Sequence, residues 1–238
     1  MIYTELKHAS HPHILKPETS ETPFTCDGCK EAGWGLRFRC ADCNYDLHKD
    51  CALSETYISH PFYGNCSLRF RNRGPADTRC NACGKLALGF VYTSGDCSLH
   101  PCCAKLQISI ENDGIELHLR KRTWTTKCGK CQSRNFRGRV GGWSYRSADK
   151  DYHFHVSCVK DMVKDLVLTR WEREHVCGNM DIASVIPELV SSCGSVGNSW
   201  RRKMKNTTLS MVAIVLNLCF SIVLGDPLGV TVFFTSLI

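Results

Sequence analysis

The sequence predicts three small repeated α+β modules, each held together by cross-links between side chains, followed by a C-terminal hydrophobic helix. Three observations support this prediction. Seventeen of the 238 residues are cysteine and ten are histidine, a Cys/His pattern recurs about every fifty residues, and the residues from 206 to 225 carry no charge. Charged residues make 22% and hydrophobic residues 43%, so wholesale disorder is not predicted. Much of the apolar share lies in the tail, so the first 160 residues have too few apolar side chains for a large hydrophobic core. They therefore need disulfide bonds or metal ions for stability.

The staples are predicted to be zinc ions rather than disulfides. The N-terminus reads MIYTELKHASHPHILK and has no apolar run of the signal-peptide type, so we expect reduced thiols. An odd number of cysteines also fits poorly with complete pairing. Reduced cysteine pairs beside histidines are typical of structural zinc sites.

Each repeat has three landmarks in a constant order. A Cys-x2-Cys pair comes first, a glycine with an aromatic residue three positions later comes second, and an apolar residue before His-x2-Cys comes last. The landmarks are Cys26/Cys29, Gly35/Phe38 and Leu47-His48-x2-Cys51, then Cys80/Cys83, Gly89/Tyr92 and Leu99-His100-x2-Cys103, then Cys128/Cys131, Gly142/Tyr145 and Phe154-His155-x2-Cys158. The order predicts three copies of one module.

The segments around these landmarks predict simple elements. Residues 36–39 alternate apolar and basic side chains, which is typical of a strand. Residues 159–173 place apolar side chains on one side of an amphipathic helix. Residues 176–199 contain Gly, Ser and Pro and are predicted to form a linker.

The first repeat carries enough candidate ligands for two tetrahedral zinc sites. They are His13, Cys26, Cys29, Cys40, Cys43, His48, Cys51 and His60. A Cys-x2-Cys turn directs two sulfurs at one ion, and His-x2-Cys does the same at the start of a helical turn. We expect the neighbouring His8 and His11 to be surface residues. Cys102, which is adjacent to Cys103, is not expected to bind metal.

This order of ligands resembles the protein-kinase-C-type (C1) zinc finger. The stretch "CDGC…GLRFRCADCNYDLHKDCA" is more similar still to its divergent version, the DC1 domain of plant cysteine/histidine-rich proteins. The resemblance covers about residues 8–170, is strong in the first repeat and is partial in the other two. It implies an interleaved pairing, in which Cys26, Cys29, His48 and Cys51 bind one zinc. His13, Cys40 and Cys43 then bind the other, with His60 at the position of the final ligand.

The second and third repeats are predicted to be degenerate copies. Their middle pair maps onto Ser94 and Cys97 in one and onto Ser147 and Lys150 in the other. Both keep the first site, with Cys80, Cys83, His100 and Cys103, and with Cys128, Cys131, His155 and Cys158. The sum is about four zinc ions per chain. Whether Cys66, Cys97, His118 or His153 also binds metal stays open.

The predicted organisation has five parts. A complete C1-like zinc finger covers 8–62, degenerate C1-like fingers cover 63–117 and 118–175, a linker and basic segment covers 176–205, and a hydrophobic membrane-associated tail covers 206–238.

The tail predicts attachment to a membrane. Twenty uncharged residues in a helix span roughly 30 Å, about the thickness of a bilayer core. Four basic residues between 201 and 205 flank this run, and the positive-inside rule then leaves the zinc fingers in the cytosol. A buried or interfacial helix in a soluble cytoplasmic or nuclear protein is the alternative.

We expect a non-enzymatic interaction or signalling protein whose protein partners the sequence does not identify. Closed four-ligand zinc sites have no open position for a substrate, and neither an HExxH zinc site nor a GxxxxGKS or GxSxG motif is present. The formal charge of +7 falls to about +4 with three Cys3His zinc sites, so nucleic acid is not the expected partner. One alternative is recognition of a diacylglycerol-like lipid headgroup, with Trp34 entering the membrane. Another is a histone-reader-like or ubiquitin-ligase-like finger.

Overall fold

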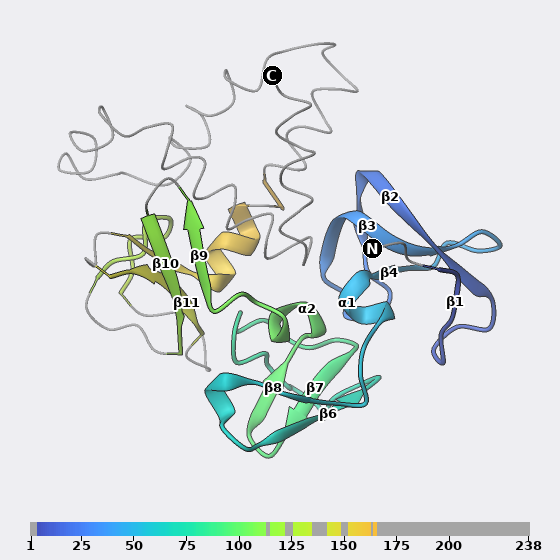
Figure 1. Ribbon diagram of the computed structural model, residues 1–238, viewed down its shortest axis with the longest axis horizontal. Coiled ribbons are helices and arrows are strands. Elements are labelled where there is room, and N and C mark those ends of the chain that lie inside the picture. The colour runs from blue at the N-terminus through green and yellow to red at the C-terminus, as the bar shows by residue number, and fades with distance from the viewer. Residues whose placement is uncertain are drawn as a thin grey trace, which may run out of the picture. The chain divides into compact units, whose positions relative to one another are not determined.

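The computed structural model describes residues 4–112, 115–121, 126–134, 142–148, 152–162 and 164–165. The chain divides near residue 106 into two compact units. The first unit holds two modules and the second holds a third module (Figure 1).

Each module contains one four-stranded antiparallel sheet whose strands follow chain order, β1 to β4, β5 to β8 and β9 to β12. The first sheet consists of β1 (Leu6–Lys7), β2 (Ile14–Thr25), β3 (Ala32–Cys40) and β4 (Asp46–His48). The second consists of β5 (Tyr57–Ser59), β6 (Ser67–Arg71), β7 (Val91–Ser94) and β8 (Cys97–Leu99). The third consists of β9 (Ser109–Asn112), β10 (Ile115–Arg120), β11 (Ser144–Ser147) and β12 (His153–His155).

A short helix follows the last strand of each sheet. These helices are α1 (Lys49–Ala52), α2 (Pro101–Ala104) and a third that includes residues 156–162. The 3-10 turn η1 (Pro61–Tyr63) lies between β5 and β6. The predicted helix over 159–173 therefore begins three residues earlier among the described residues, and its last part lies outside them.

The alternation of side chains along the strands builds a small core in each module. Leu15, Leu68 and Leu117 are fully buried and occupy equivalent positions in β2, β6 and β10. Each pairs with an aliphatic residue on the preceding strand, namely Leu6, Ile58 or Ile110. The aromatic residue three positions after the glycine is buried in every module and pairs with the apolar residue before the histidine.

The strands also show where the modules meet. The strand β5 pairs with β6 and belongs to the second sheet, and β9 pairs with β10 and belongs to the third. These strands precede the boundaries at 62/63 and 117/118 that the sequence predicts. The difference arises because β1, β5 and β9 contain few residues and carry no cysteine or histidine landmark.

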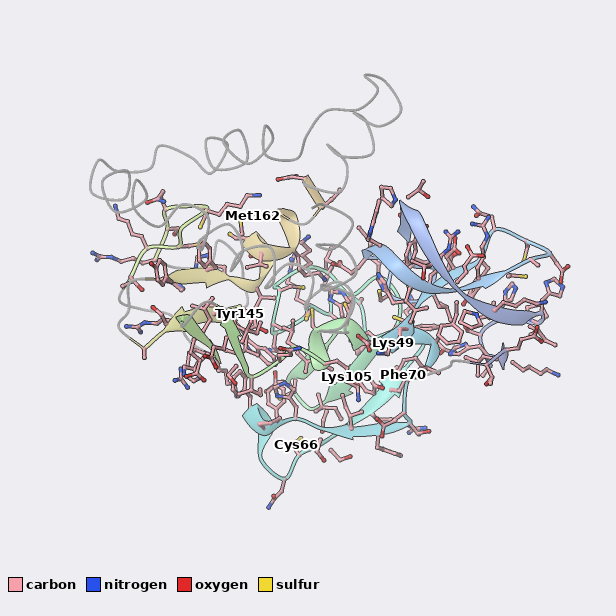
Figure 2. All side chains as sticks on the ribbon, turned by 45° about the horizontal axis from the view of Figure 1, so that its top comes forward. Lys49, Cys66, Phe70, Lys105, Tyr145 and Met162 are labelled. Atoms are coloured by element: carbon pink, nitrogen blue, oxygen red, sulfur yellow. The ribbon has the colours of Figure 1, made fainter. Side chains whose placement is uncertain are left out.

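The first two modules pack tightly against each other within the first unit. Phe90, from the second module, is 4% exposed and belongs to the same buried cluster as Cys26, Cys29 and Cys51. Its backbone N–H donates to the carbonyl of Gly28 at 2.8 Å, and Phe70, labelled in Figure 2, meets its ring edge-on at 5.1 Å. A Cβ atom on Gly89 would lie 1.9 Å from that carbonyl oxygen, so the close approach requires glycine there.

Phe90→Ala is expected to destabilise both modules of the first unit. Removing a buried phenylalanine typically lowers the free energy of unfolding by about 3–5 kcal/mol. Amide exchange in β2, β3, β6 and β7 of the zinc-loaded protein measures the effect. Leu88→Ala is the matched control, because Leu88 is 63% exposed and surface changes stay within about 0.5 kcal/mol. Equal protection in the two variants would show that the modules are independent.

The C-terminal hydrophobic helix predicted for 206–238, and the linker before it, lie outside the described residues. Within the residues that are described, none of the helices is long and apolar enough to cross a membrane.

Candidate metal centres

The first Cys-x2-Cys pair of each module lies in a turn, and the three turns have the same backbone hydrogen bonds. The N–H of the first cysteine donates to a carbonyl five residues later, and its own carbonyl accepts from the N–H four residues later. The residue at this fourth position, Lys30, Gly84 or Gln132, has a left-handed φ between 55° and 70°. This conformation turns the chain so that both sulfurs point to the same side.

The His-x2-Cys landmark supplies the other two ligand atoms of each site. The histidine is the last residue of β4 and of β12 and the first residue after β8, and in each module it directly precedes the short helix. The cysteine follows within the first turn of that helix. In all three modules Nδ1 of the histidine faces the sulfurs. It lies 3.3, 3.4 and 3.3 Å from the second cysteine of the pair, which is Cys29, Cys83 or Cys131.

The opposite ring nitrogen fixes the orientation of the histidine in the first two modules. Nε2 of His48 lies 3.1 Å from the carbonyl oxygen of Ala32, and Nε2 of His100 lies 3.3 Å from that of Leu86. A carbonyl can only accept, so Nε2 carries the hydrogen and Nδ1 is left with its lone pair toward the sulfurs. This tautomer suits a metal ligand.

The structure thus brings four side chains together at an equivalent place in every module. These clusters are Cys26, Cys29, His48 and Cys51; Cys80, Cys83, His100 and Cys103; and Cys128, Cys131, His155 and Cys158. The ligand atoms in each lie within 4.8 Å of one another. Zinc bonds of about 2.0–2.3 Å in a tetrahedron place ligand atoms roughly 3.5–4 Å apart, so the clusters fit a zinc ion.

A fourth cluster lies in the first module, and one of its members differs from the predicted ligand. It consists of His11, His13, Cys40 and Cys43. Nε2 of His11 lies 3.2 Å from the sulfur of Cys43, and Nδ1 of His13 lies 3.5 Å from the same atom. His11, expected to be a surface residue, takes the position that the sequence assigned to His60.

His60 is placed elsewhere because it belongs to the second module. It is buried and precedes η1, where its Nδ1 accepts from the N–H of Phe62 at 3.1 Å. His8 in the first module makes the equivalent bond with the N–H of Ser10 at 3.1 Å. Both follow the first strand of their sheets by one residue, so His60 repeats the local turn of His8. His11 is the cluster member that the sequence analysis did not identify. Its spacing from His13, with one residue between the two histidines, was the feature of the sequence that could have indicated it.

The second and third modules show what replaces this fourth cluster. The sulfur of Cys66 lies 3.0 Å from the hydroxyl of Ser94, which occupies the position of Cys40. Ser147 takes that position in the third module and accepts from the N–H of Tyr152 through its hydroxyl. Cys66, Cys97, His118 and His153 belong to none of the metal-type clusters among the described residues.

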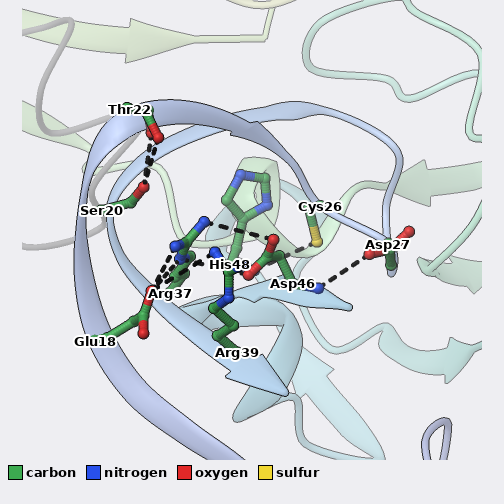
Figure 3. A network of polar contacts seen from close by, with 9 residues as sticks. All are labelled: Glu18, Ser20, Thr22, Cys26, Asp27, Arg37, Arg39, Asp46 and His48. Carbon is green, nitrogen blue, oxygen red and sulfur yellow. Dashed lines mark hydrogen bonds and ion pairs between the residues drawn. The ribbon is translucent and has the colours of Figure 1, made fainter. Parts of the chain in front are cut away.

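Polar contacts connect the metal ligands to the sheet of the first module (Figure 3). The carboxylate of Asp27, beside Cys26, accepts from the N–H of Asp46 at 3.0 Å, and the N–H of His48 donates to the sulfur of Cys26 at 3.3 Å. The buried guanidinium of Arg37 contacts the carboxylates of Glu18 and Asp46. Burial raises the pKa of the Asp46 carboxyl, and the charge of Arg37 opposes that rise. The network holds β2, β3 and β4 together beside the first cluster.

Two of the cluster cysteines, Cys26 and Cys128, have a lowered thiol pKa. A bond from Cys158 lowers the pKa of the Cys128 thiol to about 3. Burial opposes ionisation of Cys26, but bonds from Cys29, Cys51 and His48 bring its pKa well below the usual value. The thiolate is the form that binds zinc, so Cys26 and Cys128 are the ligands that ionise most readily. Hydrogen bonds with neighbouring thiols, together with burial, raise the pKa of Cys29, Cys51, Cys103 and Cys158.

These features define the class of the protein as one with several zinc fingers, in which each finger closes a small sheet through cysteine and histidine ligands. Residues 9–52 match the family model described as "C1 domain". The first module is therefore a C1-type zinc finger, and the resemblance drawn from its sequence is confirmed. Four Cys/His clusters could each hold a zinc ion.

A similar segment occurs in a plant protein. The chain is 37% identical over 51 residues to "Probable nucleoredoxin 1" of Arabidopsis thaliana. The match covers 21% of this chain and only 9% of the length of that protein. No solved structure matches the chain.

Proposed function

We propose that the protein is a non-enzymatic interaction protein whose zinc ions stabilise folded modules and take no part in chemistry. The composition of the clusters carries this proposal. Each contains four protein ligands, which is the number of a closed tetrahedral site, whereas catalytic zinc keeps one position for water or substrate. All four Cys-x2-Cys pairs take part in such clusters, which argues against a role as redox-active dithiols.

The purified protein is expected to contain about four zinc ions and to show closed coordination after replacement of zinc by cobalt. Elemental analysis gives the stoichiometry. The visible spectrum of the cobalt form reports coordination, and it should not change when azide or cyanide is added, because the sites lack an exchangeable ligand. A spectral change with either anion would indicate an open site and contradict the proposed non-enzymatic role.

Burial of Trp34 argues against the lipid-headgroup alternative. This indole is 8% exposed on β3, so it is not positioned to enter a bilayer as the sequence suggested. We therefore propose interaction with proteins in preference to recognition of lipid headgroups.

We also propose that residues 206–238 tether the modules to a membrane, with the modules in the cytosol. The support is compositional, namely a twenty-residue uncharged run preceded by basic residues. Deletion of 206–238 is expected to move the protein from the membrane fraction to the soluble fraction while its zinc content stays the same. A full-length protein that is soluble without detergent or membranes would contradict the tether, and aggregation of the deletion variant would indicate a core helix.

A further inference from the structure

The first and third modules differ sharply on the face of the sheet that carries the zinc-binding histidine. In the first module, Arg37 lies opposite His48 and is neutralised by two carboxylates from neighbouring strands. Nε of Arg37 donates to Glu18 at 2.9 Å, and Nη2 donates to the same carboxylate. Two N–H groups of one guanidinium thus point at one carboxylate.

The strand pairing gives the corresponding residues of the third module. Tyr145 pairs with the residue before His155, as Phe38 pairs with the residue before His48. In this alignment Ser144 replaces Arg37, Arg146 replaces Arg39, His153 replaces Asp46, His118 replaces Lys16 and Arg120 replaces Glu18. Both acidic positions have therefore become arginine or histidine.

This face of the third module contains buried polar atoms that lack partners. Nε and Nη2 of Arg146 are buried, and neither makes a hydrogen bond with a residue that the structure describes. The same holds for Nε2 of His153, a residue that is 2% exposed and lies directly across from Arg146. Ser144, on the same face, has a buried hydroxyl that is also without a partner in the described part of the chain.

An arginine side chain remains charged at all physiological pH values, so its buried N–H groups are costly to leave unpaired. Two carboxylates are described on this face: Glu116 lies 3.3 Å from Nε2 of His118, and Glu111 pairs with Glu116 from β9. The other neighbours are basic, since Arg120 lies beside Ser144 and His118 lies beside Arg146. The unpaired donors of Arg146 favour binding of an anion.

We propose that Arg146, with Ser144 beside it, binds a carboxylate from an acidic side chain of a partner protein. This inference deepens the proposed interaction function and rests on it. The Nε/Nη2 edge of a guanidinium matches the two oxygens of a carboxylate. In this same chain, Nε and Nη2 of Arg37 both donate to one oxygen of the Glu18 carboxylate. A water molecule that donates to both the carboxylate and Nε2 of His153 would satisfy the remaining atom.

Burial of the two nitrogens favours a side-chain carboxylate over a phosphate. Arg146 as a whole is only partly exposed, so the ligand has to enter the face of the sheet rather than rest on it. A carboxylate is planar and sits at the end of a flexible side chain, whereas a phosphate monoester is tetrahedral and wider.

The test uses full-length, zinc-loaded protein in detergent and a fluorescein-labelled tetraglutamate peptide as the probe. Fluorescence polarisation should show saturable binding. Arg146→Gln is expected to weaken it by about tenfold or more, the effect of losing hydrogen bonds to a charged group. Arg39→Gln removes the same charge at the equivalent position of the first module and should change the affinity by less than about twofold.

A second variant and a second readout keep the site distinguishable from general charge attraction or loss of folding. Arg146→Lys retains the charge but not the two parallel N–H groups, so it should also weaken binding while the zinc content stays unchanged. In NMR spectra, the peptide should shift the Nε–H signal of Arg146. Equal affinity for wild type and Arg146→Lys would overturn the proposal.

Other occupants give distinct results. Tighter binding of inorganic phosphate than of the peptide would overturn the choice of carboxylate. If the chain's own Asp149 or Asp151 fills the site, wild type will not bind the peptide and Asp149→Asn/Asp151→Asn will shift the Nε–H signal, which would also overturn the proposal. None of these outcomes changes the result of the cobalt test of closed zinc sites. Carboxylate binding at Arg146 and the non-enzymatic role can therefore be disproved independently of each other.

Discussion

Removing zinc with a strong chelator is expected to unfold all three modules. The cysteine ligands are themselves part of the core, since Cys26, Cys29 and Cys51 belong to a buried hydrophobic cluster. Structural zinc contributes on the order of 10 kcal/mol in small fingers, which is comparable to the entire stability of a small domain. Without zinc, the clustered thiolates would also repel one another.

Amide exchange at Leu15, Leu68 and Leu117 measures this effect, because these buried residues report on one sheet each. Protection should disappear at all three after chelation and return when zinc is added back. A chelator selective for calcium, at the same concentration, is the control. Protection that persists in a protein shown by elemental analysis to be free of metal would mean that the clusters do not hold the modules together.

The repeated landmarks made the three modules predictable because each landmark reflects a local requirement. Two cysteines with two residues between them need a tight turn to direct both sulfurs at one ion, and Phe38, Tyr92 and Tyr145 are buried in every copy. Such requirements act over a few residues and therefore leave a readable spacing. The weak first strands leave no such trace, which is why sequence reasoning placed the module boundaries too late.

The fourth cluster shows the limit of reasoning from ligand order alone. His60 lies at the expected distance from Cys51 along the chain, but it follows the first strand of the second sheet. His11 reaches Cys43 because the turn before β2 folds it back, with its ring stacked on Tyr45 at 4.1 Å. That stacking depends on residues 34 positions apart, and no spacing rule contains it.

The sequence also did not reveal the contacts between modules or the unpaired polar groups. Phe90 is one apolar residue among many in the sequence, and only the fold places it in the core of the preceding module. Arg146 acquires its significance from the loss of carboxylates at positions that strand pairing alone identifies. Both depend on register, which the short strands do not specify by themselves.

Cys131→Ser is expected to unfold the third module, whereas Cys43→Ser should leave much of the first module folded. The two cysteines are a matched pair, since each is exposed and each belongs to a four-ligand cluster. The third module has a single such cluster among its described residues, while the first has two. Loss of Cys43 thus leaves Cys26, Cys29, His48 and Cys51 to hold β4 and α1 against the sheet, supported by the ion pairs of Arg37.

In the Cys131→Ser variant, amide protection at Leu117 and Tyr145 should be lost together with one zinc. In the Cys43→Ser variant one zinc should also be lost, but protection at Phe38 and Leu47 should remain. Cys66→Ser serves as the control and should retain all the zinc, because Cys66 contacts Ser94 and lies outside the clusters. Retained protection at Leu117 without Cys131 would show that the sheet of the third module is stable on its own. Its metal would then have to be explained by something other than folding.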